Sequence, residues 1–223
     1  MVSYKDISIR KFIKLQEIIN ETKELDELAI QAKLIAVIND MTEDEVLSLR
    51  LTEYGRKASE LSFLEHKPEL KGRVPDKIMI GDRKFEVIKD PKRLSTAQYI
   101  DFQTLLKMDN PDKYLPNLLA CFIIPYGKEY GEYDIMEIAD YFADNMDVQQ
   151  GLELLHFFQL RSLRLISNTV RYLELKMKRA IRKEKDKETK EKLKEGLNKM
   201  EELLSLINTD GYTMLISQQK HKE

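Results

Sequence analysis

The sequence predicts a mainly α-helical fold: a helical bundle with one small β-hairpin and a long C-terminal helical hairpin. Apolar residues recur three and four positions apart over most of the 223 residues, which is the period of one helix face. Only one short stretch, residues 78–87, alternates with a period of two. From Val148 to the last residue there is no proline, so nothing in that region interrupts a long helix.

Helices are expected throughout residues 1–66, which we predict as an N-terminal helical domain. The first helix follows Ser8, and the second covers residues 25–39. Thr42 and Glu45 match the capping box, in which a hydroxyl accepts a backbone N–H and the carboxylate three residues later reaches back. A third helix therefore begins there. Prolines and a glycine then mark residues 66–76 as an exposed linker.

A β-hairpin is expected next, because two short alternating runs flank Gly81-Asp82 and glycine accepts the positive φ of such turns. An isolated hairpin is barely stable in water, so it must lie against helices or a partner's strand. Its edges would also offer unpaired N–H and C=O groups to an extended chain. The apolar residues of the two runs are therefore candidate partner contacts: Ile78, Ile80, Phe85 and Val87.

Three further helices complete a predicted middle domain, residues 77–147. Ser95 and Gln98 form a second capping box, which opens a helix that ends near residue 106. The next helix is expected over residues 114–124, and a short one over residues 135–142.

The last predicted domain, residues 148–210, is a long helical hairpin. One helix is expected from Val148 to Lys183, about 54 Å long at 1.5 Å per residue. A second, over residues 188–207, carries apolar residues at heptad-like spacing. The two would fold back on each other around the charged residues 182–190. One continuous domain for the whole chain is the alternative.

Candidate chemistry is sparse, and we predict no enzyme, no cofactor and no metal site. The three histidines, His66, His156 and His221, form no His-x-x-x-His pair, and Glu-x-x-His occurs once, at Glu153 and His156, whereas a di-iron site needs it on two helices. Cys121 lies within an apolar run, which favours a buried side chain over a reactive thiol. Four carboxylates share one helix face, which favours a solvated acidic surface over a metal cage: Asp134, Glu137, Asp140 and Asp144.

Charge is the one marked feature of the C-terminal region. The whole chain has a net charge of −2, whereas residues 171–199 contain twelve basic and six acidic residues, a local charge of +6. The candidate basic patch is Lys176, Lys178, Arg179, Arg182 and Lys183. A basic helix can grip phosphates without regard to sequence. Because acidic residues are interleaved after residue 184, a docking surface for an acidic partner or another copy is favoured over nucleic acid.

A membrane is not expected to be a partner. No apolar run approaches the length that crosses a bilayer. Residues 1–20 also lack the basic-then-apolar layout of a secretory signal.

Two segments carry a resemblance to a known family. Residues 77–87 with residues 95–103, and residues 118–128 with Tyr133-Asp134 after them, resemble segments of tail-assembly or baseplate-associated, assembly chaperone-like proteins of tailed bacteriophages infecting Bacteroidetes. The resemblance covers residues 75–182 and is a pattern of residue types.

The resemblance implies a non-enzymatic phage protein that acts in tail assembly, as a chaperone or a minor virion component. It implies phage structural proteins, or a second copy, as partners. The implied location is the host cytoplasm during assembly, with the virion as a second location. That family has no catalytic residues to carry over. The alternative function is a helical nucleic-acid-associated protein that uses the basic C-terminal helix.

Overall fold

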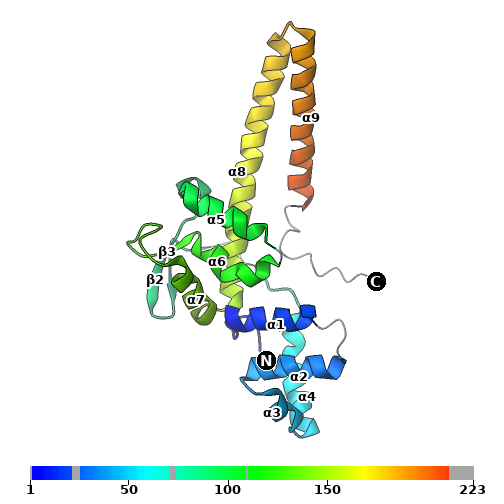
Figure 1. The fold of residues 1–223 in the computed structure, drawn as a ribbon, viewed down its shortest axis with the longest axis vertical. Helices are drawn as coiled ribbons and strands as arrows, with labels where there is room; N and C mark the ends of the chain where they lie inside the picture. Colours follow the sequence, from blue (N-terminus) through cyan, green and yellow to red (C-terminus); the bar gives the residue numbers. More distant parts are fainter. Residues whose placement is uncertain (1, 22–25, 71–73, 109, 211–223) are drawn as a thin grey trace. The chain divides into compact units, whose positions relative to one another are not determined.

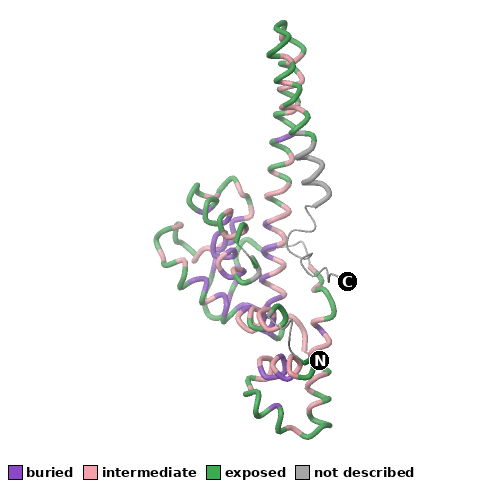
Figure 2. Tube along the Cα trace, turned by 45° about the vertical axis from the view of Figure 1, so that its right-hand side comes forward, coloured by how far each residue is buried: buried purple, intermediate pink, exposed green. Residues whose placement is uncertain are grey.

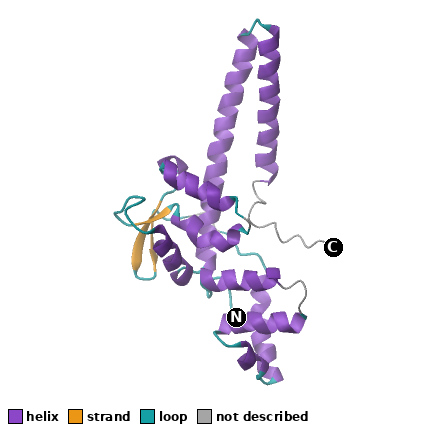
Figure 3. Ribbon diagram, in the orientation of Figure 1, coloured by secondary structure: helices purple, strands orange, loops and turns teal. Residues whose placement is uncertain are grey.

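The chain folds mainly into α-helices with one small antiparallel sheet (Figures 1 and 3), which confirms the predicted fold class. The computed structural model describes residues 2–21, 26–70, 74–108 and 110–210. In chain order the elements are α1 (Ile9–Glu21), α2 (Glu27–Asn39), α3 (Glu43–Leu47), α4 (Leu51–Ser59), η1 (Glu60–Glu65), β1 (Lys77–Ile80), β2 (Arg83–Val87), η2 (Pro91–Arg93), α5 (Thr96–Leu106), η3 (Pro111–Tyr114), α6 (Leu115–Ala120), β3 (Ile123–Pro125), α7 (Ile135–Asn145), α8 (Val148–Lys183) and α9 (Lys187–Asp210).

By its internal contacts the chain divides into two compact units. Unit 1 comprises Met1–Lys89 and Arg93–Phe157, and unit 2 comprises Asp90–Lys92 and Phe158–Glu223. Helix α8 runs through this division. The segments 1–66 and 77–147, predicted as separate domains, therefore share unit 1, and their independent folding stays a prediction.

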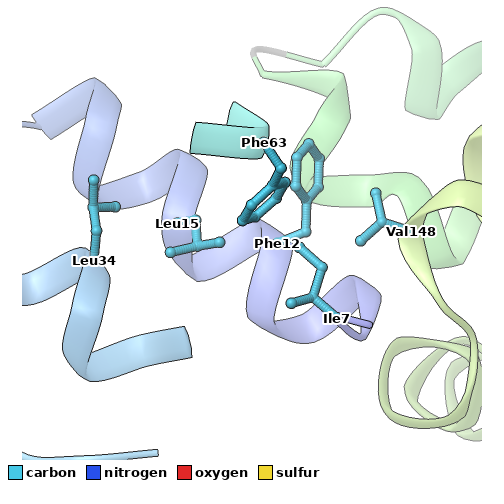
Figure 4. Close-up of a cluster of buried hydrophobic side chains, with 6 residues drawn as sticks. All are labelled: Ile7, Phe12, Leu15, Leu34, Phe63 and Val148. Carbon is cyan, nitrogen blue, oxygen red and sulfur yellow. The ribbon is translucent and has the colours of Figure 1, made fainter. Parts of the chain in front are cut away.

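The N-terminal helices of unit 1 close on an apolar core (Figure 4). Its buried side chains come from the N-terminal segment, α1, α2, η1 and the first residue of α8: Ile7, Phe12, Leu15, Leu34, Phe63 and Val148. The backbone is tied at the same place. The amide of Ile9 donates to the carbonyl of Met146 at 3.1 Å, and the amide of Val148 donates to the carbonyl of Ile7 at 3.1 Å. The start of α1 is thereby fixed to the junction between α7 and α8.

The predicted helix caps form as expected. Thr42 and Ser95 each accept the backbone N–H three residues on, and Glu45 and Gln98 reach back, so both capping boxes are complete. The Asp134 carboxylate accepts the amides of two residues in the first turn of α7. These caps satisfy backbone donors that a helix leaves unpaired at its N-terminus.

The hairpin is confirmed, with β1 and β2 antiparallel around Gly81, whose φ is +55°. A third strand extends it, so the sheet has the order β1-β2-β3. In the register of the pair, Phe85 lies opposite Ile78 on one side and Pro125 on the other.

That third strand corrects the helix predicted over residues 114–124. The helix ends at Ala120, and Ile123–Pro125 pairs with β2. A short, continuous apolar run does not distinguish a helix from a buried strand by period alone. Here the β-branched Ile123 and Ile124 favour the strand, and the free side of β2 supplies its backbone partners.

Unit 2 contains the C-terminal helical hairpin, in which the helices lie side by side and antiparallel (Figures 1 and 2). The bounds of α8 are those predicted, Val148–Lys183. Asp186 accepts the amide of Thr189 at 2.8 Å at the start of α9. The helices approach closely at Gly196, where an added Cβ would lie 2.9 Å from Cε of Met177.

Candidate functional site

The outer face of α8 in unit 2 carries a row of arginines. Positions 161, 164, 168, 171, 175, 179 and 182 step by three and four, which places them on one face, within an arc of about 80° at 3.6 residues per turn. Five of these positions are exposed arginines, which we call the α8 arginine stripe: Arg161, Arg164, Arg171, Arg179 and Arg182. Asn168 and Leu175 fill the other two positions and are also exposed.

The stripe faces away from α9. Met177 lies against Gly196 of α9 and so marks the side of α8 that packs on α9, and the buried Val170 lies on the same side of α8 by helical phase. They lie about half a turn of the helix from the stripe. The arginines therefore lie away from the contact between Met177 and Gly196.

The predicted basic patch is divided by the structure. Arg179 and Arg182 belong to the stripe, and Lys183 is exposed nearby. Lys178 instead pairs with Glu174 and with Glu201 of α9, and the hydrogen bond to Glu174 raises the pKa of Lys178. Lys176 lies over the ring of Tyr172, 5.0 Å from its centroid.

Three members of the stripe, Arg161, Arg164 and Arg171, were missed by the sequence prediction. Counting charges along the sequence favours the dense cluster from residue 176 onward, because such a count takes no account of the helix face on which each residue lies. Plotting the basic residues of residues 158–183 on a helical wheel would have found the stripe, because all five arginines fall on one face while the three lysines flank it.

Three of the five lysines of α9 differ from these arginines, because each of the three pairs with a glutamate. Lys192 pairs with Glu188 at 2.6 Å, Lys194 with Glu191 at 2.8 Å and Lys199 with Glu195 at 2.8 Å. Such pairs are typical of a solvated helix surface and contribute little to stability. In the part of the chain that the structure describes, Arg164, Arg171, Arg179 and Arg182 have no carboxylate within ion-pair distance.

The four hairpin residues predicted to contact a partner are buried within the chain: Ile78, Ile80, Phe85 and Val87. Phe85 packs edge-on against Phe142 of α7, with ring centroids 5.0 Å apart. These side chains therefore pack within the chain, and a partner contact through the backbone edge of the hairpin stays a prediction. Alternation identifies one face of a hairpin, and here the chain's own α7 contacts that face.

Exposed apolar side chains instead gather where α3 meets α4. Leu47 is 69% exposed and Leu51 is 85% exposed, and we call these two the Leu47–Leu51 corner. Leu49, between them, packs against the buried core formed by α2 and α3. The corner is held in place because Val46 is fully buried and the hydroxyl of Tyr54 donates to Gln31 at 3.0 Å. Two exposed leucines thus lie on a backbone that is anchored by buried neighbours.

A pocket of about 620 Å³ lies against α1 and α2 of unit 1. Four of its charged side chains form ion pairs with one another. Lys11 donates to Asp40 at 2.6 Å. Arg10 holds Asp144 and Asp140, and its hydrogen bond lowers the pKa of Asp144. These carboxylates, predicted to form a solvated acidic face, act as partners of Arg10 and tie α1 to α7.

Cys121 is buried, as predicted. Its Sγ donates to the carbonyl of Asn117 at 3.4 Å. Burial raises the pKa of the Cys121 thiol to about 12. Because the thiolate is the nucleophilic form, this environment suppresses the reactivity of the thiol.

Alkylation of the native protein with iodoacetamide at pH 8 is expected to leave Cys121 unmodified. The raised pKa lowers its thiolate fraction about a thousandfold relative to a free thiol, and burial restricts access further. Intact-mass spectrometry reads the result directly, since the chain has one cysteine. The same protein unfolded in guanidinium chloride is the control and should be fully alkylated. Modification of the native chain at the rate of the unfolded one would contradict the expected role as a packing residue.

Metal ligands do not gather in the structure. Among the residues that it describes, no group of three His, Cys, Asp or Glu side chains could hold a metal ion. Nδ1 of His66 lies 3.0 Å from the carbonyl oxygen of Ser62, His156 is half-buried in α8, and His221 lies outside the described residues. Within the described part of the chain, no helix has the length and apolar character needed to cross a membrane.

Comparisons with protein-family models, with curated proteins and with solved structures found no match to this chain.

Proposed function

We propose that the chain is a non-enzymatic bacteriophage protein that acts in tail assembly through protein contacts, as an assembly chaperone or a minor virion component. The phage context is supported by the resemblance of residues 75–182. The protein contact is supported by one structural observation, the exposure of Leu47 and Leu51 on a fixed frame. Its partner is a phage structural protein, met in the host cytoplasm during assembly.

The energetic basis of this contact is burial of the Leu47–Leu51 corner. Covering an exposed leucine side chain contributes about 1.5 to 3 kcal/mol. Single exposed apolar residues are common on monomers, but two leucines this exposed, with only three residues between them, offer a compact apolar anchor. A partner that covers both would gain affinity without any rearrangement of α3 or α4.

Retention of phage structural proteins by the tagged chain tests this proposal. The wild type, exposed to lysate of phage-infected cells, should retain an identified virion structural protein. The double variant L47Q/L51Q should retain at least about tenfold less of that protein. A factor of ten in affinity corresponds to about 1.4 kcal/mol, and the loss of one leucine contact already costs about that much. The control I100Q/M136Q removes two other exposed apolar side chains of unit 1 and should retain the wild-type amount.

Two results would overturn the proposal. One is a wild-type chain that retains no virion structural protein. The other is an L47Q/L51Q variant that retains as much as the wild type while remaining helical by circular dichroism. Mass spectrometry of purified virions separates the two roles, because a minor virion component stays in the particle and a chaperone does not.

A further inference from the structure

The charge on α8 is sorted by residue type around the helix. Residues 158–183 contain eight basic residues and one acidic residue, Glu174. The five arginines occupy the outer face, and Lys176, Lys178 and Lys183 flank it on both sides. Glu174 is paired with Lys178. The charged side chains of the outer face are therefore all cations.

We propose that the α8 arginine stripe binds the phosphate backbone of a nucleic acid duplex, without regard to base sequence. This inference goes beyond the proposed protein contact and does not rest on it, since the stripe lies in unit 2 and the Leu47–Leu51 corner lies in unit 1.

Guanidinium groups suit this target for a chemical reason. Arginine presents a planar fork of N–H donors that pairs with two phosphate oxygens at once and gives up its hydration more readily than lysine does. From Arg161 to Arg182 the stripe is about 31 Å long, at 1.5 Å per residue. That length matches about nine base pairs of duplex, in which phosphates recur regularly along the axis.

The unpaired state of Arg164, Arg171, Arg179 and Arg182, among the residues that the structure describes, separates α8 from an ordinary solvated helix. Three of the five lysines of α9 pair with glutamates one turn away. Four arginines of the stripe have no such glutamate partner among the described residues, whereas glutamates one turn away from a lysine recur in α9. Charge left uncompensated along about five helical turns, from Arg164 to Arg182, is suited to an external polyanion.

Other occupants fit the stripe less well. A second copy docked stripe to stripe would place arginines against arginines, and like charges in contact disfavour association. A lipid surface is held by an amphipathic helix with a broad apolar face, whereas the apolar groups exposed on or beside the stripe are Tyr172 and Leu175. Interfaces with nucleic acid are much more positively charged than those with proteins, which favours a duplex over an acidic protein segment.

Salt-dependent binding to DNA tests the proposal. Fluorescence anisotropy with two duplexes of unrelated sequence should give equal affinities for the full chain. If five phosphates are neutralised, log K should fall with log salt at a slope of about −4.5. Affinity should then drop about 500-fold between about 50 and 200 mM salt.

A pair of variants isolates the stripe. R164Q/R171Q/R179Q/R182Q removes four charges from the stripe and leaves Arg161, which makes another interaction within the chain. Its salt slope should flatten to about −0.9, because one phosphate contact remains. The control K190Q/K192Q/K194Q/K199Q removes four charges from α9 and should keep the wild-type slope. Glutamine preserves helix propensity in both, and circular dichroism checks the fold.

Several results would overturn the inference. One is a wild type that binds no duplex at low salt, and another is a stripe variant that keeps the wild-type salt slope. A salt slope that flattens equally in the α9 variant would mean that DNA binding depends on the net charge of the chain and not on the stripe. Competition by polyglutamate as strong as that by duplex would assign the stripe to an acidic protein segment. Binding to vesicles rich in phosphatidylserine, with none to duplex, would assign it to a lipid surface.

Discussion

Replacing Phe142 by alanine is expected to lower the free energy of unfolding by about 3 to 5 kcal/mol. Phe142 is fully buried on α7, and its ring stands edge-on to that of Phe85 in β2, with centroids 5.0 Å apart. Truncation removes this aromatic contact and leaves a cavity between the helix and the sheet, which the surrounding backbone fills only in part. Chemical denaturation followed by circular dichroism measures the loss.

The matched control is Met136→Ala on the same helix. Met136 is 62% exposed, so its truncation should change the free energy of unfolding by no more than about 0.5 kcal/mol. Equal denaturation midpoints for the Phe142 and Met136 variants would mean that α7 does not cover the sheet as described.

Local signals in the sequence predicted much of the fold correctly. Capping boxes at Thr42 and Ser95 depend on side chains only three residues apart, so they can be recognised in the sequence alone. Helix α8 was predicted from Val148 to Lys183 because its apolar period is long and contains no proline. The hairpin followed from two alternating runs around Gly81.

Long-range packing could not be predicted in the same way. Strand β3 forms because β2, more than thirty residues earlier in the chain, provides its backbone hydrogen-bond partners. The hydrophobic period of the residues around β3 carries no information about this pairing. Burial of the hairpin side chains likewise depends on α7, which lies more than fifty residues later. Alternation told which residues share a face of the hairpin, but the covering element lay too far away in sequence to be identified.

The two candidate sites differ in the same way, because one depends on local sequence and the other on long-range packing. The α8 arginine stripe is a property of one helix, so helical phase could have found it in the sequence. The Leu47–Leu51 corner is not local in this sense. Leu49 packs into the core while its neighbours do not, and only the folded arrangement of α2, α3 and α4 distinguishes the three leucines.

Replacing Gly81 by alanine is expected to lower the free energy of unfolding by about 2 to 3 kcal/mol. Gly81 has a φ of +55° in the hairpin turn, and a Cβ there would collide with the hydroxyl of Tyr141. That hydroxyl lies 2.7 Å from the carboxylate of Asp82 and 2.9 Å from the carbonyl of Ile80, and it accepts the amide of Asp82 at 3.2 Å. The new methyl group would therefore strain the turn and displace the side chain that fixes it to α7.

Gly55→Ala is the matched control, because the same methyl group should there have the opposite effect. Gly55 lies within α4, and nothing is within 4 Å of its added Cβ. Alanine at that position should raise the free energy of unfolding by about 0.5 to 1 kcal/mol, through better helix propensity and a less flexible unfolded chain. Denaturation midpoints that move in opposite directions for the two variants are the expected result. A Gly81→Ala variant as stable as the wild type would mean that the turn and Tyr141 are not in contact.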